Sequence, residues 1–203
     1  MVKKAILNNL ISNQDLTSLE KHLVCQFLNN KNLDFTQSPI LTEYFKGFEQ
    51  DTVLFFGVSA LEIESIKDLE NHLELIIPKT DRKLNGAFFT PDYIIDFIIN
   101  EVKQQTTEKN LDTRCGCGAF LIGLTDYYKN TFGKSIKSIV KENIFGSDIL
   151  AYNIHRTKLL LTIYALQNNE ILDESDFNLY NQDSLKAEWN LQFDTVVGNP
   201  PYV

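Results

Sequence analysis

Apolar side chains recur at helical spacing through the first 80 residues. The two clearest stripes contain Ala5, Ile6, Leu7, Leu10 and Ile11, then Leu16, Leu19, Leu23, Phe27 and Leu28. Apolar residues three and four positions apart share one side of a helix, so both stretches are predicted to be amphipathic helices. A third such stretch runs from Phe55 to Ile77. Residues 1–80 are therefore predicted to form a helical N-terminal region.

The third helical stretch also carries acidic residues between its apolar positions. They are Glu62, Glu64, Asp68, Glu70 and Glu74. We interpret them as a solvated helix face rather than a metal site. No catalytic spacing is visible in residues 1–80.

The pattern changes after the polar residues 78–83, which we interpret as the boundary of a second domain. Short apolar runs now alternate with helical stretches, and the runs interpreted as strands end at Leu111 and span 143–149, 177–185 and 193–197. Strands that alternate with helices favour a parallel sheet. The predicted fold class is α/β, with a doubly wound, mainly parallel, Rossmann-like sheet in residues 81–203.

Each predicted strand leads to a polar residue. Asp112, Asp148 and Asp183 end the first three strands, and Asn199 follows the fourth. The carboxyl ends of parallel strands meet at one edge of the sheet, which is where open α/β sheets bind ligands. We therefore expect these four side chains to border one ligand site.

Local motifs flank these strand ends. Gly116 and Gly118 form a Gly-x-Gly loop before an apolar helix, and glycine lets a backbone approach a ligand closely. Thr90 is placed to cap a helix that has Pro91 at its first position. Two prolines after Asn199 can neither continue a helix nor pair in a sheet, so the chain is expected to turn out of the sheet there.

Composition sets the broad class of protein. The chain has 203 residues, 43% of them hydrophobic and 23% charged, and no run of 18 apolar residues or signal peptide is present. We expect a cytoplasmic protein with no membrane contact. Three cysteines give neither a disulfide framework nor a zinc-site pattern. The net charge of −8 argues against this chain by itself binding widely to a phosphate backbone.

Residues 85–203 resemble the amino-terminal half of the catalytic domain of S-adenosylmethionine-dependent DNA adenine-N6 methyltransferases. The resemblance is greatest to the combined type II restriction–methylation class of restriction–modification systems. Five motifs follow the family's order: Gly86–Pro91, Asp112–Phe120, Asp148, Asp183 and Asn199–Tyr202.

The resemblance implies S-adenosylmethionine as cofactor. The residues that it assigns to cofactor binding are Phe89, Thr90, Pro91, Asp112, Cys115, Gly116, Gly118, Asp148, Ile149 and Asp183. The methionine part would lie near Thr90 and the glycine loop. The ribose would bind Asp148, and the adenine would bind Asp183 and pack on Ile149.

The resemblance also implies the reaction. A target adenine flipped out of double-stranded DNA would stack on Tyr202. The side-chain carbonyl of Asn199 and the backbone carbonyl of Pro200 would accept its two N6 hydrogens and direct the nitrogen lone pair at the methyl group. Asn199, Pro200 and Tyr202 are thus the expected catalytic residues, and no general base or metal is expected.

The sequence departs from the family in three places. Thr113 and Arg114 stand where the family's glycine motif usually has Pro-Ala or Pro-Ser, so a large cation replaces a small residue and weaker cofactor binding is expected. The strand before the loop is polar from 104 to 110, whereas a central parallel strand is normally apolar. The family's later strands and DNA-recognition domain are missing. We therefore expect an N-terminal part that is inactive alone, as a truncated chain or as one half of a split enzyme with a complementary polypeptide.

Two alternatives remain beside DNA methylation. Protein glutamine N5 methyltransferases share Asn-Pro-Pro-Tyr and a helical N-terminal domain, although the Gly86–Pro91 motif and the glycine loop favour DNA. The other alternative is a non-catalytic remnant that binds a partner polypeptide through its helices and an exposed sheet edge.

Overall fold

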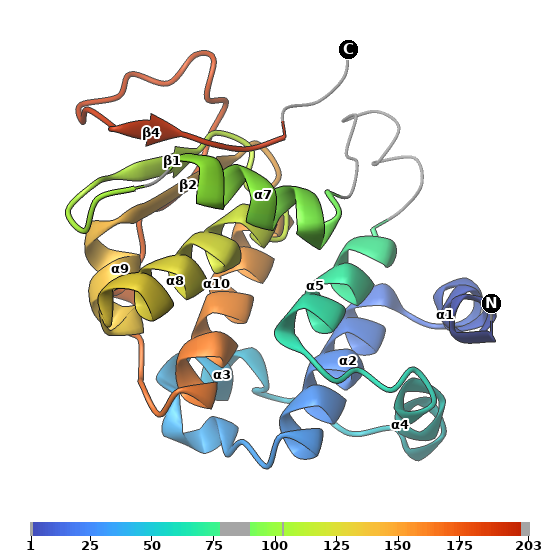
Figure 1. Cartoon of the computed structure of the whole chain (residues 1–203). Helices are drawn as coiled ribbons and strands as arrows, with labels where there is room; N and C mark the ends of the chain where they lie inside the picture. The colour runs from blue at the N-terminus through green and yellow to red at the C-terminus, as the bar shows by residue number, and fades with distance from the viewer. Residues whose placement is uncertain (1, 78–89, 103, 200–203) are drawn as a thin grey trace.

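Helices form the N-terminal region, as predicted, in the computed structural model, which describes residues 2–77, 90–102 and 104–199. The elements are α1 (Val2–Asn13), α2 (Leu16–Asn30), η1 (Phe35–Gln37), α3 (Pro39–Tyr44), α4 (Thr52–Ser59) and α5 (Ile66–Leu75) (Figure 1). Asp15, Ser38, Asp51 and Ser65 each precede a helix and accept a backbone N–H from its first turn. Such caps satisfy donors that have no partner inside the helix, so the local sequence sets the helix starts.

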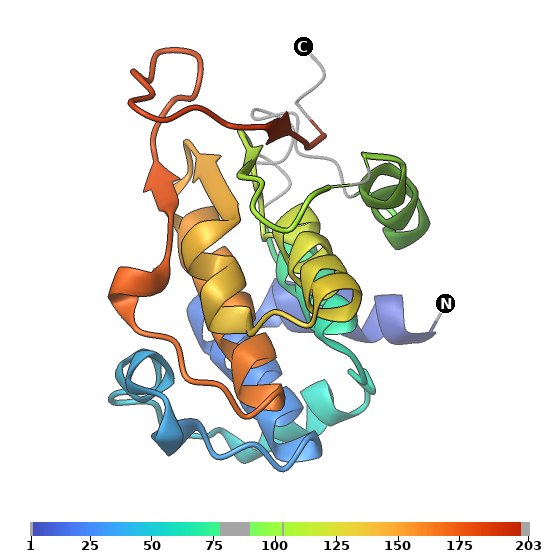
Figure 2. The same cartoon turned by 60° about the vertical axis from the view of Figure 1, so that its left-hand side comes forward.

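One hydrophobic core joins the N-terminal helices to the second half of the chain. Leu23 of α2, Leu73 of α5 and Leu160 are fully buried in the same cluster. Leu160 belongs to α10 (Ala151–Gln167), which contacts α5 as well as the sheet. In Figures 1 and 2, α10 and α8 (Ala119–Phe132) lie between the sheet and the N-terminal helices.

Four strands form a parallel sheet, which agrees with the predicted α/β class. They are β1 (Asn110–Asp112), β2 (Ile144–Asp148), β3 (Leu179–Asn181) and β4 (Thr195–Val196), in the spatial order β3-β2-β1-β4. In the register, Leu111 of β1 lies between Phe145 of β2 and Val196 of β4. The remaining helices are α7 (Asp92–Val102), which packs on α8, and α9 (Ile136–Glu142), which precedes β2.

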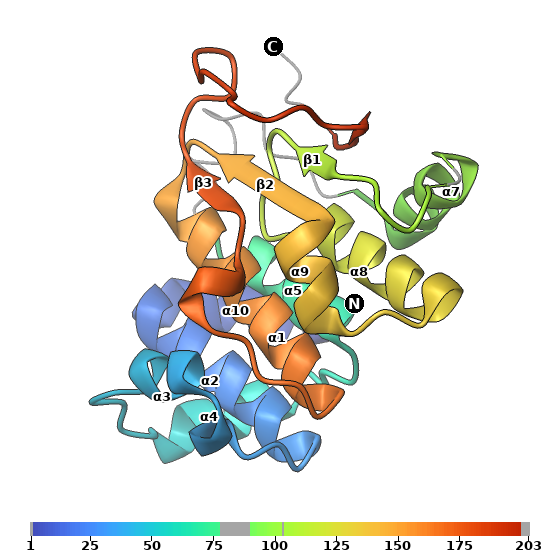
Figure 3. The same ribbon diagram turned by 90° about the vertical axis from the view of Figure 1, so that its left-hand side faces the viewer.

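The two faces of the sheet are covered differently in the described residues. A Cβ added to Gly146 would lie 2.7 Å from Leu121 of α8, so this position faces the helices. Its neighbours in β2 point the other way. Ser147 hydrogen-bonds Ser184 at 2.7 Å, and Phe145 packs on Phe193. Figure 3 shows α8 and α10 on one side of β1 to β3, while the connection 182–194 covers the other.

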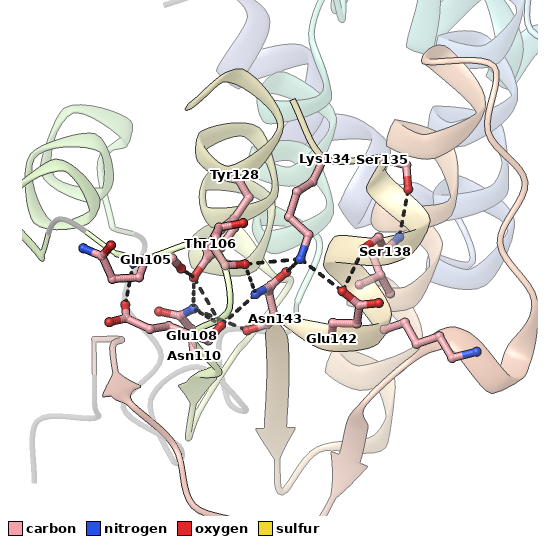
Figure 4. A network of polar contacts seen from close by, with 12 residues as sticks. Gln105, Thr106, Glu108, Asn110, Tyr128, Lys134, Ser135, Ser138, Glu142 and Asn143 are labelled. Carbon is pink, nitrogen blue, oxygen red and sulfur yellow. Dashed lines mark hydrogen bonds and ion pairs between the residues drawn. The ribbon is translucent and has the colours of Figure 1, made fainter. Parts of the chain in front are cut away.

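A polar network explains how the polar stretch before β1 is accommodated (Figure 4). Asn110 is fully buried, and its Nδ2 donates to the Tyr128 hydroxyl at 2.9 Å. The Asn143 amide donates to the backbone carbonyls of Thr106 and Glu108 at 3.1 and 2.8 Å. The sequence predicted that this polar stretch would make a poor central strand. The structure accommodates it because only three residues pair as β1 and polar side chains hydrogen-bond the backbone before them.

Removal of one member of this network tests its contribution. We expect Asn143→Ala to lower the free energy of unfolding by about 2 kcal/mol, because the fully buried Asn143 side chain loses its hydrogen bonds to the backbone carbonyls of Thr106 and Glu108. Urea denaturation measures the change. Asn130→Ala on the exposed side of α8 is the matched control, and its expected change is within about 0.5 kcal/mol. Equal effects of the two substitutions would contradict a structural role for the network.

Candidate functional site

The carboxyl ends of β1, β2 and β4 border one pocket. The predicted site residues that line it are Thr90, Asp112, Cys115, Gly116, Asp148 and Asn199. They lie before α7, at the ends of β1 and β2, in the loop before α8, and after β4. The parallel sheet brings them together because its strands all point toward this edge.

The turn after β4 is joined to the segment before α7. The Nδ2 of Asn199 donates a hydrogen bond to the Thr90 hydroxyl at 3.1 Å, across 109 residues of sequence. The prediction of the helix start was wrong by one residue, because α7 begins at Asp92 and the Pro91 carbonyl accepts the N–H of Ile94. Pro91 therefore occupies the position before the helix, and Thr90 lies outside it.

Asp112 is a buried carboxyl that lines the pocket. Its side chain is 2% exposed, and its Oδ1 accepts the N–H of Arg114 at 3.0 Å. Burial raises the pKa of Asp112 to about 7, the Arg114 N–H opposes this rise, and the charge of Asp148 adds to it. Gly198 lies against the same carboxyl, because a Cβ there would be 2.6 Å from Oδ1.

Asp148 is fixed against the glycine loop. Its Oδ2 accepts the N–H of Gly116 at 3.1 Å, and its Oδ1 accepts the N–H of Leu150 at 2.8 Å. Burial raises the pKa of Asp148, whereas hydrogen bonds from Leu150, the Asn153 side chain and Gly116 lower it. The carboxyl thus has a set orientation at the end of β2.

The glycine loop has the backbone conformation that its residues predict. Gly116 and Gly118 have φ values of 55° and 95°, in the left-handed region. Thr157 of α10 donates to the Gly116 carbonyl at 2.9 Å, and a Cβ at Gly118 would lie 3.0 Å from the Thr157 side chain. The Cys115 side chain is buried, and burial raises the pKa of its thiol. Cys115 is therefore a packed thiol rather than a nucleophile.

The other predicted site residues lie beside the pocket or outside the described residues. Ile149 is 58% exposed directly after Asp148. Asp183 does not line the pocket, and its carboxylate pairs with Lys186 at 3.1 Å. Arg114 does line it. Phe89, Pro200 and Tyr202 lie outside the described residues.

The family model for N-6 DNA methylase matches residues 70–203. The chain belongs to the N-6 DNA methylase family. The match begins within α5 and includes every residue of the pocket.

Relatives of this chain include methylase subunits of type I restriction enzymes. The EcoEI methylase subunit of Escherichia coli is 24% identical over 204 residues, which cover 94% of this chain and 40% of that protein. The MjaVII methylase subunit of Methanocaldococcus jannaschii is 29% identical over 122 residues, which cover 58% of this chain and 18% of that protein. The chain thus spans less than half the length of these relatives.

A solved structure with a similar arrangement is the modification subunit of a putative type I restriction enzyme from Vibrio vulnificus YJ016. The TM-score is 0.46 at 17% sequence identity, and the match covers 72% of this chain and 32% of that one.

The pocket has further lining residues that were not predicted from the sequence. Glu74 of α5, Ile77 just after it, and Asn153 of α10 also line it. The interpretation of the acidic residues as a solvated face was wrong for Glu70, which is 2% exposed. A signal was available, because Glu70 lies four residues after Ile66 and seven before Ile77 and so shares their apolar side.

A second correction concerns α10. The apolar pattern of residues 150–168 predicts that His155, Arg156 and Lys158 point outward, but Arg156 is 8% exposed and its guanidinium binds Glu20 of α2 at 2.7 Å. It thereby ties α10 to the N-terminal helices. In the part of the chain that the structure describes, no cluster of acidic, cysteine and histidine side chains has metal-site geometry. The described helices are all too short or too polar to cross a membrane.

Proposed function

We propose that this chain supplies the cofactor site and the amine-binding turn of a DNA adenine-N6 methyltransferase of a restriction–modification system. One observation carries the proposal: residues from separate sequence motifs line a single pocket, in which Asn199 bonds Thr90. Restriction–modification relatives support DNA as the substrate class. No feature of the described residues favours protein glutamine instead.

The residues of the pocket fit S-adenosylmethionine. Asp148 offers carboxylate lone pairs to ribose hydroxyls, and the exposed Ile149 beside it offers an apolar surface to an adenine ring. Gly116 and Gly118 bring the backbone close to a ligand. Thr90 and Asp112 would bind the methionine part. When bound, the cofactor supplies an electrophilic methyl group.

The hydrogen bond between Asn199 and Thr90 supports a role of Asn199 in amine binding. Its amide nitrogen is engaged by Thr90, which leaves its carbonyl oxygen as an acceptor. That oxygen and the Pro200 carbonyl would accept the two hydrogens of an adenine amine and favour the positive charge that develops on nitrogen. Tyr202 would stack on the flipped base, which costs a few kcal/mol to extrude.

The proposed partners are double-stranded DNA and a complementary polypeptide. The edge strand β4 supports the second, because Val196 is 65% exposed there. We also propose a division into a helical region, 1–80, and a partial methyltransferase domain, 81–203. In this division α5 contributes to both parts, because Glu74 lines the cofactor pocket.

Cofactor binding tests the proposal. Titration calorimetry of the 203-residue chain with S-adenosylmethionine is expected to show binding. Asp148→Ala is expected to weaken it at least about tenfold, because a charged acceptor is worth about 1.5–3 kcal/mol. Lys46→Ala, at an exposed position, is the control with unchanged affinity. No heat with millimolar ligand, or equal affinities of Asp148→Ala and the wild type, would refute the assignment.

A further inference from the structure

Asn153 is a pocket residue with one hydrogen-bonding group in use and one unused. It lies in the first turn of α10, and its side chain is 4% exposed. The side chain hydrogen-bonds Asp148. Among the described residues, its Oδ1 has no hydrogen-bond partner.

Rotation of the Asn153 amide by about 180°, which exchanges its oxygen and nitrogen, would not give a better hydrogen-bonding arrangement. An Asn side chain presents a carbonyl oxygen on one side and a donor on the other. Exchange of the two would turn the oxygen toward the Asp148 carboxylate and break the bond that Asp148 accepts. The Asn153 oxygen is thus unpaired because the Asn153 amide nitrogen donates to Asp148.

An unpaired buried carbonyl is costly. Leaving such a group without a donor costs about 1–3 kcal/mol, and most buried polar atoms in native proteins are paired. On the same side of α10, Thr157 bonds the Gly116 carbonyl and Arg156 bonds Glu20. Both of these side chains make hydrogen bonds within the chain, whereas the buried Oδ1 of Asn153 makes none. Because Asn153 lines the pocket, a ligand bound there can supply the missing donor.

We propose that Asn153 is a further cofactor-binding residue, whose Oδ1 accepts a hydrogen bond from a ribose hydroxyl. The inference rests on the proposed function. The class of ligand group is a vicinal diol, such as the 2′ and 3′ hydroxyls of ribose. Its two hydroxyls are neutral hydrogen-bond donors, and they match two neighbouring acceptors, the Asp148 carboxylate and the Asn153 side-chain carbonyl. Asn153 thus makes the site selective for ribose over deoxyribose.

Ribose-modified ligands test this selectivity. The probes are S-adenosylhomocysteine and its 2′-deoxy and 3′-deoxy counterparts, with calorimetry as the readout. For the wild type, we expect one of the two deoxy ligands to lack the hydroxyl that donates to Asn153. Its affinity should be about fivefold lower than that of S-adenosylhomocysteine, because it is bound through Asp148 alone. In Asn153→Ala and in the similarly sized Asn153→Leu, that ratio is expected to fall to about twofold or less.

The controls separate this inference from the function on which it rests. Asn168→Ala, at the opposite end of α10, should keep the wild-type ratios. Unchanged ratios in both Asn153 variants would overturn the inference, and so would equal weakening of all three ligands, which would make Asn153 only a support for Asp148. Failure of the wild type to bind the parent ligand would instead refute the proposed function. Thermal unfolding establishes that each variant is folded.

Discussion

At pH 8, Asp112→Asn is expected to raise the free energy of unfolding by up to about 4 kcal/mol. Burial raises the pKa of Asp112 to about 7 in the folded chain, against about 3.9 for an unperturbed aspartate. The folded state therefore favours the protonated carboxyl. The stability that this protonation gives is complete below about pH 4 and is lost as the pH rises to 7. A difference of about three pKa units corresponds to about 4 kcal/mol.

Urea denaturation at pH 4 and pH 8 measures this effect. The gain of Asp112→Asn over the wild type should be near zero at the lower pH and largest at the higher one. Asp96→Asn, which changes an exposed carboxyl of α7, is the control and should show no comparable trend. A gain that is the same at both pH values would contradict the buried charge as its cause.

The same substitution is expected to weaken cofactor binding. In the proposed function, the ionised Asp112 attracts the positively charged part of the ligand, and a neutral amide cannot replace this attraction. Stability and binding should thus change in opposite directions, as is typical of residues held in unfavourable surroundings for the sake of a site.

Gly198→Ala is the second substitution with a large expected effect. Its Cβ would lie 2.6 Å from Oδ1 and 3.2 Å from Cγ of Asp112, and both distances are shorter than normal contacts. Asp112 has little room to move, because it is buried and bonded to Arg114. We expect a loss of about 3 kcal/mol in the free energy of unfolding, since overpacking displaces backbone. Asn199 follows directly and should leave Thr90, so cofactor binding should weaken as well.

Gly57→Ala provides the matched control for this substitution. Its Cβ would approach the end of the flexible Leu10 side chain at 3.1 Å, inside the helix α4. Alanine is favoured over glycine in a helix by about 1 kcal/mol, so the stability should not fall. A Gly198→Ala variant with wild-type stability and affinity would show that the end of β4 can shift away from Asp112 without consequence.

The positions of the strand-end residues could be predicted because they follow from topology. Parallel strands bring their carboxyl ends to one edge, so the order of Asp112, Asp148 and Asn199 along the chain was sufficient to group them. Asp183 was expected in the same group, but the chain turns after β3 and Lys186 pairs with its carboxylate. The site roles of all four residues stay predictions.

The missed residues depend on tertiary packing. Glu74 and Asn153 line the pocket because α5 packs on α10, and no local pattern predicts which helices will meet. The polar stretch before β1 shows the same limit. Its partners, Tyr128 and Asn143, come from later elements, so the stretch alone indicated a poor strand.

The position of α5 restricts how such chains can exchange parts during evolution. Glu74 of α5 and Ile77 just after it form a pocket wall, while Leu69 and Leu73 of α5 are buried in the core shared with α10. A recombination point at residue 80 would separate the wall from the pocket and expose those leucines to a foreign surface. Functional exchange between relatives therefore requires a crossover upstream of α5, so that this helix is inherited together with the sheet.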